Sequence, residues 1–236
     1  MVPSNPVDLI HELDRLTTAQ FETPEFRQLL SLPITLARAQ CYVLHRAHFQ
    51  RNRRTVWPYV QAAVPLDLKR MIWDHEREEL DYDPRAGTNH IILGIRECEA
   101  VGLNVAEIEA AELVPAASAC FWAWIHLAIT RPWLEAFTAS SMMERMNSGQ
   151  VIPAGGLSEQ MGRNIAQGLG IPLERLVNSS VHMEADVEHS TMLDFVAERY
   201  ATTDEARQAM LRGARDSFII DRAFRGAIAE AMEDLP

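Results

Sequence analysis

The sequence predicts an all-α protein whose helices pack as a bundle. Segments that open after a proline or a capping residue recur along the 236 residues, and apolar residues within them fall at helical spacing. No stretch alternates apolar and polar residues as a half-buried strand would, and no repeat, low-complexity tract or linker is visible. Because the connecting segments are mostly short, we expect one domain over residues 1–236.

Start and stop signals predict each helix in turn. Asn5 followed by Pro6 is typical of an N-cap and a first helical residue, and Thr202 with Glu205 fits a capping box. A helix that ends at about Arg54 is followed by a further short one over residues 56–64, which Pro58 interrupts. The predicted helices cover residues 6–17, 24–32, 34–54, 56–64, 66–82, 90–101, 105–111, 115–130, 132–147, 158–169, 173–200 and 203–232.

Composition limits the class of protein. An apolar fraction of 47% predicts a globular chain, and a net charge of −11 disfavours nucleic acid as a partner. The three cysteines, Cys41, Cys98 and Cys120, form no CxxC pair, which favours a reducing compartment and a packing role. No signal peptide is visible, and the longest apolar stretch, residues 114–129, is too short to span a bilayer. We therefore expect a cytoplasmic protein with no membrane partner.

The most informative stretch is residues 180–190. On a helix, His182, Asp186 and His189 fall within roughly 60° of one another, whereas Glu184 and Glu188 face away. Two imidazoles and a carboxylate on one face are ligands that iron, manganese and zinc accept. A solvated acidic face is the competing interpretation of the same stretch.

Further metal ligands are expected from other helices. Glu144 lies among apolar residues, and Glu79 belongs to a strongly charged run that is followed by a loop and then by His90. His45 and His48, three residues apart, are two more candidates. Bundle-core metal sites draw carboxylates and histidines from several facing helices. Taken singly, each of these residues is equally compatible with a surface or packing role.

The order Glu79, loop, His90, Glu144 and His182-x3-Asp186-x2-His189 resembles the heme-oxygenase-like dimetal oxidases over about residues 30–225. That family is related to thiaminase-II-like and pyrroloquinoline-quinone-synthase-like bundles. The resemblance implies a heme-oxygenase-like helical bundle that holds two irons, or iron with manganese, and uses O₂. It also implies oxidation of small acids or amino acids by desaturation, C–C cleavage, decarboxylation or N-oxygenation.

One departure from the family pattern concerns the first core helix, which usually supplies another glutamate. This chain has no Asp or Glu between residues 26 and 66. His45 lies in about the right place, so either it substitutes as a weaker ligand or that coordination position is open. A histidine there would remove one negative charge from the site.

We therefore expect a non-heme dimetal oxidase that acts on a small carboxylate-bearing substrate, an amino acid or a fatty acid, in small-molecule biosynthesis. The expected ligands are His45, Glu79, His90, Glu144, His182, Asp186 and His189. A homodimer is an open alternative to a monomer. Two other functions stay open: a metal-free thiaminase-II-like hydrolase or lyase, and a non-catalytic iron-binding interaction protein.

Overall fold

The computed structural model describes residues 3–236, and Met1 and Val2, the first residues of the expected domain, lie outside the described residues. The described residues form eleven α-helices and one 3-10 turn, with no β-strand, so the all-α prediction is confirmed. The elements are α1 (Pro6–Gln20), α2 (Pro24–Ser31), α3 (Leu36–Ala63), α4 (Leu66–Leu80), α5 (His90–Ala100), α6 (Val105–Ala110), α7 (Pro115–Thr130), α8 (Trp133–Asn147), α9 (Leu157–Leu169), η1 (Leu173–Arg175), α10 (Val177–Tyr200) and α11 (Asp204–Glu233).

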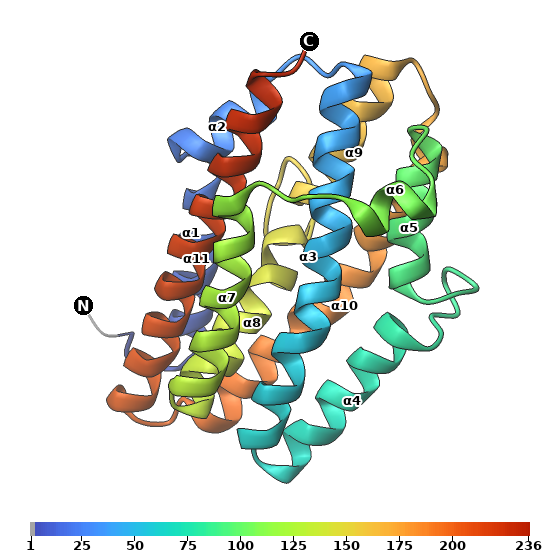
Figure 1. Cartoon of the computed structure of the whole chain (residues 1–236). Coiled ribbons are helices and arrows are strands. Elements are labelled where there is room, and N and C mark those ends of the chain that lie inside the picture. The colour runs from blue at the N-terminus through green and yellow to red at the C-terminus, as the bar shows by residue number, and fades with distance from the viewer. Residues whose placement is uncertain (1–2) are drawn as a thin grey trace.

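The bundle is built around α8. Every residue from Leu134 to Met146 is buried, because α11, α10 and α3 pack around this helix. Figure 1 shows α3, α7 and α11 running along one side, α10 behind α3, and α4 diverging from the lower end of α3. Glu144 is therefore a core residue by its position on the central helix.

Close packing of α11 on α8 depends on Gly213. A Cβ atom at this position would lie 2.2 Å from the Glu135 carbonyl oxygen, which is far inside van der Waals contact. Glycine alone lets the two backbones approach this closely. The resulting tight pair of long helices forms one wall of the core.

The prediction of two separate helices over residues 34–54 and 56–64 is wrong, because α3 is one continuous helix. Pro58 costs this helix one hydrogen bond and crowds the preceding turn, but its side chain is exposed. Val56, Trp57 and Val60 on the adjoining turns are buried and hold both halves of the helix to the core. The continuous helix brings the middle of α3 opposite α4.

The other helix bounds agree with the predicted ones to within a few residues. The last helix is capped one residue later than expected, since the Thr203 hydroxyl, and not that of Thr202, accepts the bond from the Ala206 N–H. The preceding long helix is split, so that a 3-10 turn at Leu173–Arg175 comes before α10.

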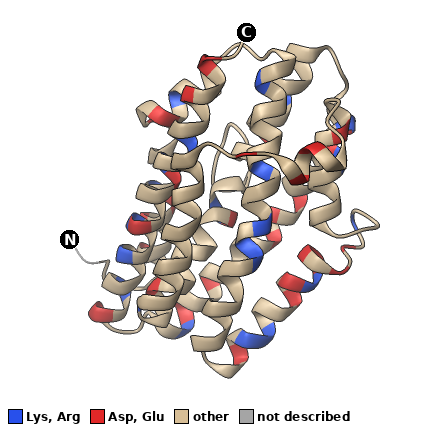
Figure 2. Ribbon diagram, viewed as in Figure 1, with Lys and Arg blue, Asp and Glu red and all other residues tan. Residues whose placement is uncertain are grey.

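Charge is distributed unevenly over the bundle. Figure 2 shows α7 without charged residues, while they crowd along α4 and the part of α3 that faces it. Even so, none of the helices within residues 3–236 is long and apolar enough to cross a membrane. The charged end of the bundle, between α3, α4, α5 and α10, is where the candidate metal ligands lie.

Candidate metal centre

The central face of α10 has the orientation that helical spacing predicts. His182, Asp186 and His189 are buried at 6%, 0% and 4% exposure, whereas Glu184 and Glu188 are exposed. The three buried polar groups point into the bundle toward α4, α5 and α8, so this stretch is not a solvated acidic face.

Six buried side chains gather there in two groups of three. Within each group the nitrogen or oxygen atoms that could bind a cation lie within 4.8 Å of one another. We call them the first group, which is His75, Glu144 and His189, and the second group, which is Glu79, His90 and His182. Each group therefore offers two imidazoles and one carboxylate. The two groups adjoin, since the rings of His90 and His189 are 6.2 Å apart.

Both histidines of α10 have one ring nitrogen fixed by the protein and the other free. Nδ1 of His182 donates to the Asn178 carbonyl oxygen at 2.8 Å, which leaves Nε2 as a free acceptor. Nε2 of His189 bonds Glu78 at 3.0 Å, and its Nδ1 has no partner although it is buried. An outer hydrogen bond that fixes the tautomer in this way is typical of metal-binding histidines.

The other two histidines follow the same pattern. Nδ1 of His75 lies 3.1 Å from Glu76, and its buried Nε2 has no partner. Nε2 of His90 bonds Asp83 at 2.8 Å, while its Nδ1 faces Glu79 at 2.9 Å. All four imidazoles therefore turn one nitrogen toward the groups and one toward an outer oxygen acceptor.

Asp186 lies between the two groups. Its side chain is fully buried, and neither carboxylate oxygen has a hydrogen-bond partner. Burial, together with the charges of Glu144 and Glu79, raises its pKa well above the usual range. Since one of those glutamates belongs to each group, Asp186 is close to both. A buried carboxylate without partners is costly unless a cation binds it, so these residues fit a pair of metal ions.

Protonation differs between the histidines. Burial lowers the pKa of His75 and of His182 well below the usual value, so both are neutral and can accept a metal. Burial acts in the same direction on His90, but Glu79 and Asp83 outweigh it and raise its pKa to about 9. In the protein without metal, His90 is thus a cation held between two carboxylates.

The middle of α3 supplies cations to the carboxylates of both groups. Arg54 lies 2.5 Å from Glu79 and 3.4 Å from Glu76, and Arg53 lies 3.6 Å from Glu144. These guanidinium groups offset part of the negative charge of the clustered carboxylates. A metal ion at either group would take over the carboxylate that an arginine now holds.

His45, expected as a weaker ligand, is not brought to either group. Its Nδ1 bonds the Cys41 carbonyl oxygen at 2.8 Å, and its Nε2 accepts from the Val114 N–H at 3.1 Å. Both ring nitrogens are thus used by backbone groups, one on α3 itself and one at Val114, just before α7. His48 is also engaged, with Nε2 at 2.9 Å from the Ile108 carbonyl oxygen.

His75 is the site residue that the sequence interpretation missed. A signal was present, because His75 and Glu79 are four residues apart on α4 and therefore share a face. The surrounding run of charges hid it, since most residues in such a run are solvated. Three acids of that run are outer partners of site histidines: Glu76 of His75, Glu78 of His189 and Asp83 of His90.

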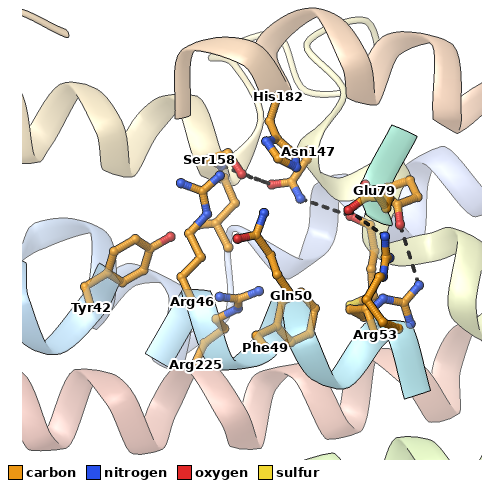
Figure 3. Close-up of a pocket in the computed structure, with 14 residues that line it drawn as sticks. Tyr42, Arg46, Phe49, Gln50, Arg53, Glu79, Asn147, Ser158, His182 and Arg225 are labelled. Atoms are coloured by element: carbon orange, nitrogen blue, oxygen red, sulfur yellow. Dashed lines mark hydrogen bonds and ion pairs between the residues drawn. The ribbon is translucent and has the colours of Figure 1, made fainter. Parts of the chain in front are cut away.

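The centre borders two spaces. His75 and His189 line an open cleft of about 760 Å³ between α4 and α10. Glu79, His182 and Glu144 line a much smaller cavity of about 40 Å³ on the other side, shown in Figure 3 together with Arg46, Arg53 and Arg225. We call this small space the arginine cavity.

Comparison with known proteins supports the interpretation of the fold. The model of the family described as "Iron-containing redox enzyme" matches residues 40–220. A domain of unknown function with a heme oxygenase-like fold from Shewanella denitrificans superposes with a TM-score of 0.76 at 12% identity, covering 96% of this chain and 93% of that one. A TenA homologue from P. horikoshii gives 0.61 at 14% identity, covering 92% and 99%. No curated protein has significant sequence similarity to the chain. The predicted heme-oxygenase-like fold is confirmed.

Proposed function

Because the chain belongs to the iron-containing redox enzyme family, we propose that it is an O₂-dependent non-heme oxidase with two metal ions. The metals are two irons, or iron with manganese. The substrate is a small carboxylate-bearing molecule, and the reaction serves small-molecule biosynthesis.

The composition of the two groups carries this proposal. Each group contains two histidines and one carboxylate, the ligand combination that non-heme Fe(II) oxygenases use while leaving positions open. Asp186 lies next to both and has two free oxygens, which suits a carboxylate shared by two ions. Seven buried ligand residues in adjoining groups exceed the four that one structural zinc site takes.

The iron would supply the activation of O₂, and the residues of the chain would do the rest. His75, Glu144 and His189 would hold one ion, and Glu79, His90 and His182 would hold the other. Glu76, Glu78, Asp83 and the Asn178 carbonyl oxygen keep the imidazoles in the required tautomer. The core around α8 buries the side chains of both groups, which would strengthen the electrostatic interactions among them.

Metal analysis combined with an O₂ assay tests the proposal. Protein loaded anaerobically with Fe(II) should bind up to two equivalents and consume O₂ when air is admitted. Only trace metal under saturating Fe(II) would contradict it. Two equivalents without any O₂ consumption would instead identify an iron-binding protein that is not an oxidase.

The similarity to a TenA homologue suggests one alternative, a metal-free hydrolase or lyase on the same fold. A metal-free enzyme of this kind would depend on a nucleophilic cysteine. Burial raises the pKa of Cys98 to about 12 and that of Cys120 to about 11, and it also raises the pKa of Cys41. These thiols are protonated at neutral pH and are poor nucleophiles, so the oxidase is the better supported function.

A further inference from the structure

The arginine cavity contains buried hydrogen-bond donors that no protein group satisfies. Arg46, Arg53 and Arg225 line it and are only 5%, 2% and 2% exposed. Nη2 of Arg46, Nε and Nη1 of Arg53, and Nη1 of Arg225 have no acceptor. Because buried guanidinium N–H groups are nearly always paired, three of them at one cavity point to an acceptor that the chain itself does not supply.

Arg46 is held in place so that it cannot turn to another acceptor. Its Nη1 donates to Glu97 at 2.7 Å and to the Ser179 hydroxyl at 2.8 Å, and all three side chains are buried. This triad joins α3 to α5 and α10. The unused Nη2 is the part of the guanidinium that remains available to a ligand.

Arg225 on α11 is fixed in a similar way. Its Nε donates to the buried Asp221 at 3.1 Å, and its guanidinium lies over the rings of Phe49 and Phe224 at 5.1 and 4.9 Å. Stacking on aromatic faces holds the planar fork while leaving its edge free for a planar anion. Nη1 is that free edge.

The cavity has two distinct ends. Figure 3 shows Arg46, Gln50 and Arg225 gathered on one side of it, and Arg53 with Glu79 on the other. Glu79 and His182 belong to the second group, and Glu144 to the first. A molecule whose anionic end meets Arg46 and Arg225 therefore directs its other end toward the metal-binding residues.

We propose that the arginine cavity binds the carboxylate of a short polar acid through Arg46 and Arg225, with Arg53 facing the end near the metal centre. The inference rests on the proposed function, because it makes this acid the oxidase's substrate. About 10–15 Å³ of such volume holds one water molecule, so about 40 Å³ has room for only a short molecule. Of the two substrate types expected from the sequence, an amino acid or similar short acid fits and a fatty acid does not.

Calorimetric titration of the anaerobic Fe(II)-loaded protein tests the proposal. The probes are acetate and malonate, with acetamide as the uncharged match and decanoate as the long acid. Acetate or malonate should bind, and acetamide and decanoate should bind at least about tenfold more weakly, because charge-assisted bonds to arginine are lost or the chain does not fit.

The paired substitution Arg225→Gln with Asp221→Asn removes the ion pair without leaving a buried charge unpaired. It should weaken acetate and malonate binding at least about tenfold while iron content and thermal midpoint stay near those of the parent. Arg207→Gln is the matched control. Arg207 is likewise buried, at 7% exposure, and its Nε is unpaired, but it does not line the cavity. It should leave binding unchanged.

Full iron loading without carboxylate binding would overturn this inference and leave the proposed function standing. Unchanged binding in the paired variant, acetamide equal to acetate, or decanoate tighter than malonate would also overturn it. If no iron loads, the proposed function fails, and the same titrations on the metal-free protein still decide whether the cavity binds short acids through Arg225.

Discussion

The two metal-binding groups have the same composition but different surroundings. In the second group, His90 is bonded on both nitrogens, and Glu79, which lines the arginine cavity, is held by Arg54 and His90. In the first group, His75 and His189 each keep an unpaired buried nitrogen beside an open cleft. Even without metal, the second group is largely satisfied by protein partners, whereas the first group is not. Protein charges therefore hold the second group in place, whereas the first group would need a bound metal to do so.

The largest expected effect comes from Asp186, the residue that both groups share. Asp186→Asn should lower iron content at both groups and reduce turnover by more than about 100-fold, since even outer partners of ligands are worth about 10–100-fold. It should also raise the thermal midpoint of the metal-free protein, because an unpaired buried carboxylate is removed. Iron content, turnover and the midpoint are measured together.

Glu184→Ala and Glu188→Ala are the matched controls for this experiment. Both residues are exposed on the same helix, and such substitutions usually change stability by less than about 0.5 kcal/mol. Loss of iron in the Glu184 variant with full iron in the Asp186 variant would mean that the other face of α10 forms the site.

The next effect separates the groups. His75→Ala should reduce iron from two equivalents to at most one, because it removes an imidazole of the first group only. His45→Ala, which removes another buried histidine whose nitrogens are both bonded to backbone, should keep both equivalents. The iron content of the two variants is measured. Loss of iron in the His45 variant with two equivalents in the His75 variant would identify His45 as the ligand in place of His75.

A smaller effect is expected from an outer partner of the second group. Asp83→Asn replaces the carboxylate that accepts from Nε2 of His90 and should weaken iron binding there by about 10–100-fold. Competition with a chelator measures the affinity. Asp81→Asn, an exposed change on the same segment, serves as the control and should leave affinity unaltered.

The smallest effect is a pH dependence of the metal-free protein. The pKa of His90 is raised to about 9 from an unfolded value of about 6.5. Its contribution to the free energy of unfolding is therefore fully present below about pH 6.5 and is lost as the pH rises through about 9. Denaturant titrations at both ends of this window should show the loss.

The same titrations on the Asp83→Asn variant should show a smaller loss, since one carboxylate that raises the His90 pKa is gone. A loss of the same size in both proteins would assign the pH dependence to other groups. His75, whose pKa burial lowers well below the usual value, stays neutral in the folded protein, so its contribution changes only near pH 6.5, where the unfolded imidazole titrates, and in the opposite direction.

The sequence predicted most of the helices and the phase of α10, because both depend on local periodicity. Six predicted ligands lie in or beside the two groups, namely Glu79, His90 and His182 in the second, Glu144 and His189 in the first, and Asp186 next to them. His75 and the role of Arg53 and Arg54 were not predicted. Their position depends on how far α3 continues past Pro58 and on the angle at which α4 leaves it, which are tertiary features.

The helices that carry the ligands have a consequence for how iron is taken up. α4 supplies His75 to one group and Glu79 to the other, while α10 supplies His189 and His182 in the same way. α4 packs mainly on α3 and α5, and polar contacts link it to α10, between Asp67 and Tyr200 and between Glu78 and His189. If two ions bind as proposed, an ion at one group would add a further link between the two helices and bring the remaining ligands into register for the second ion. Occupancy of the two positions would then be positively coupled, and half-loaded protein would be the scarce species during iron uptake.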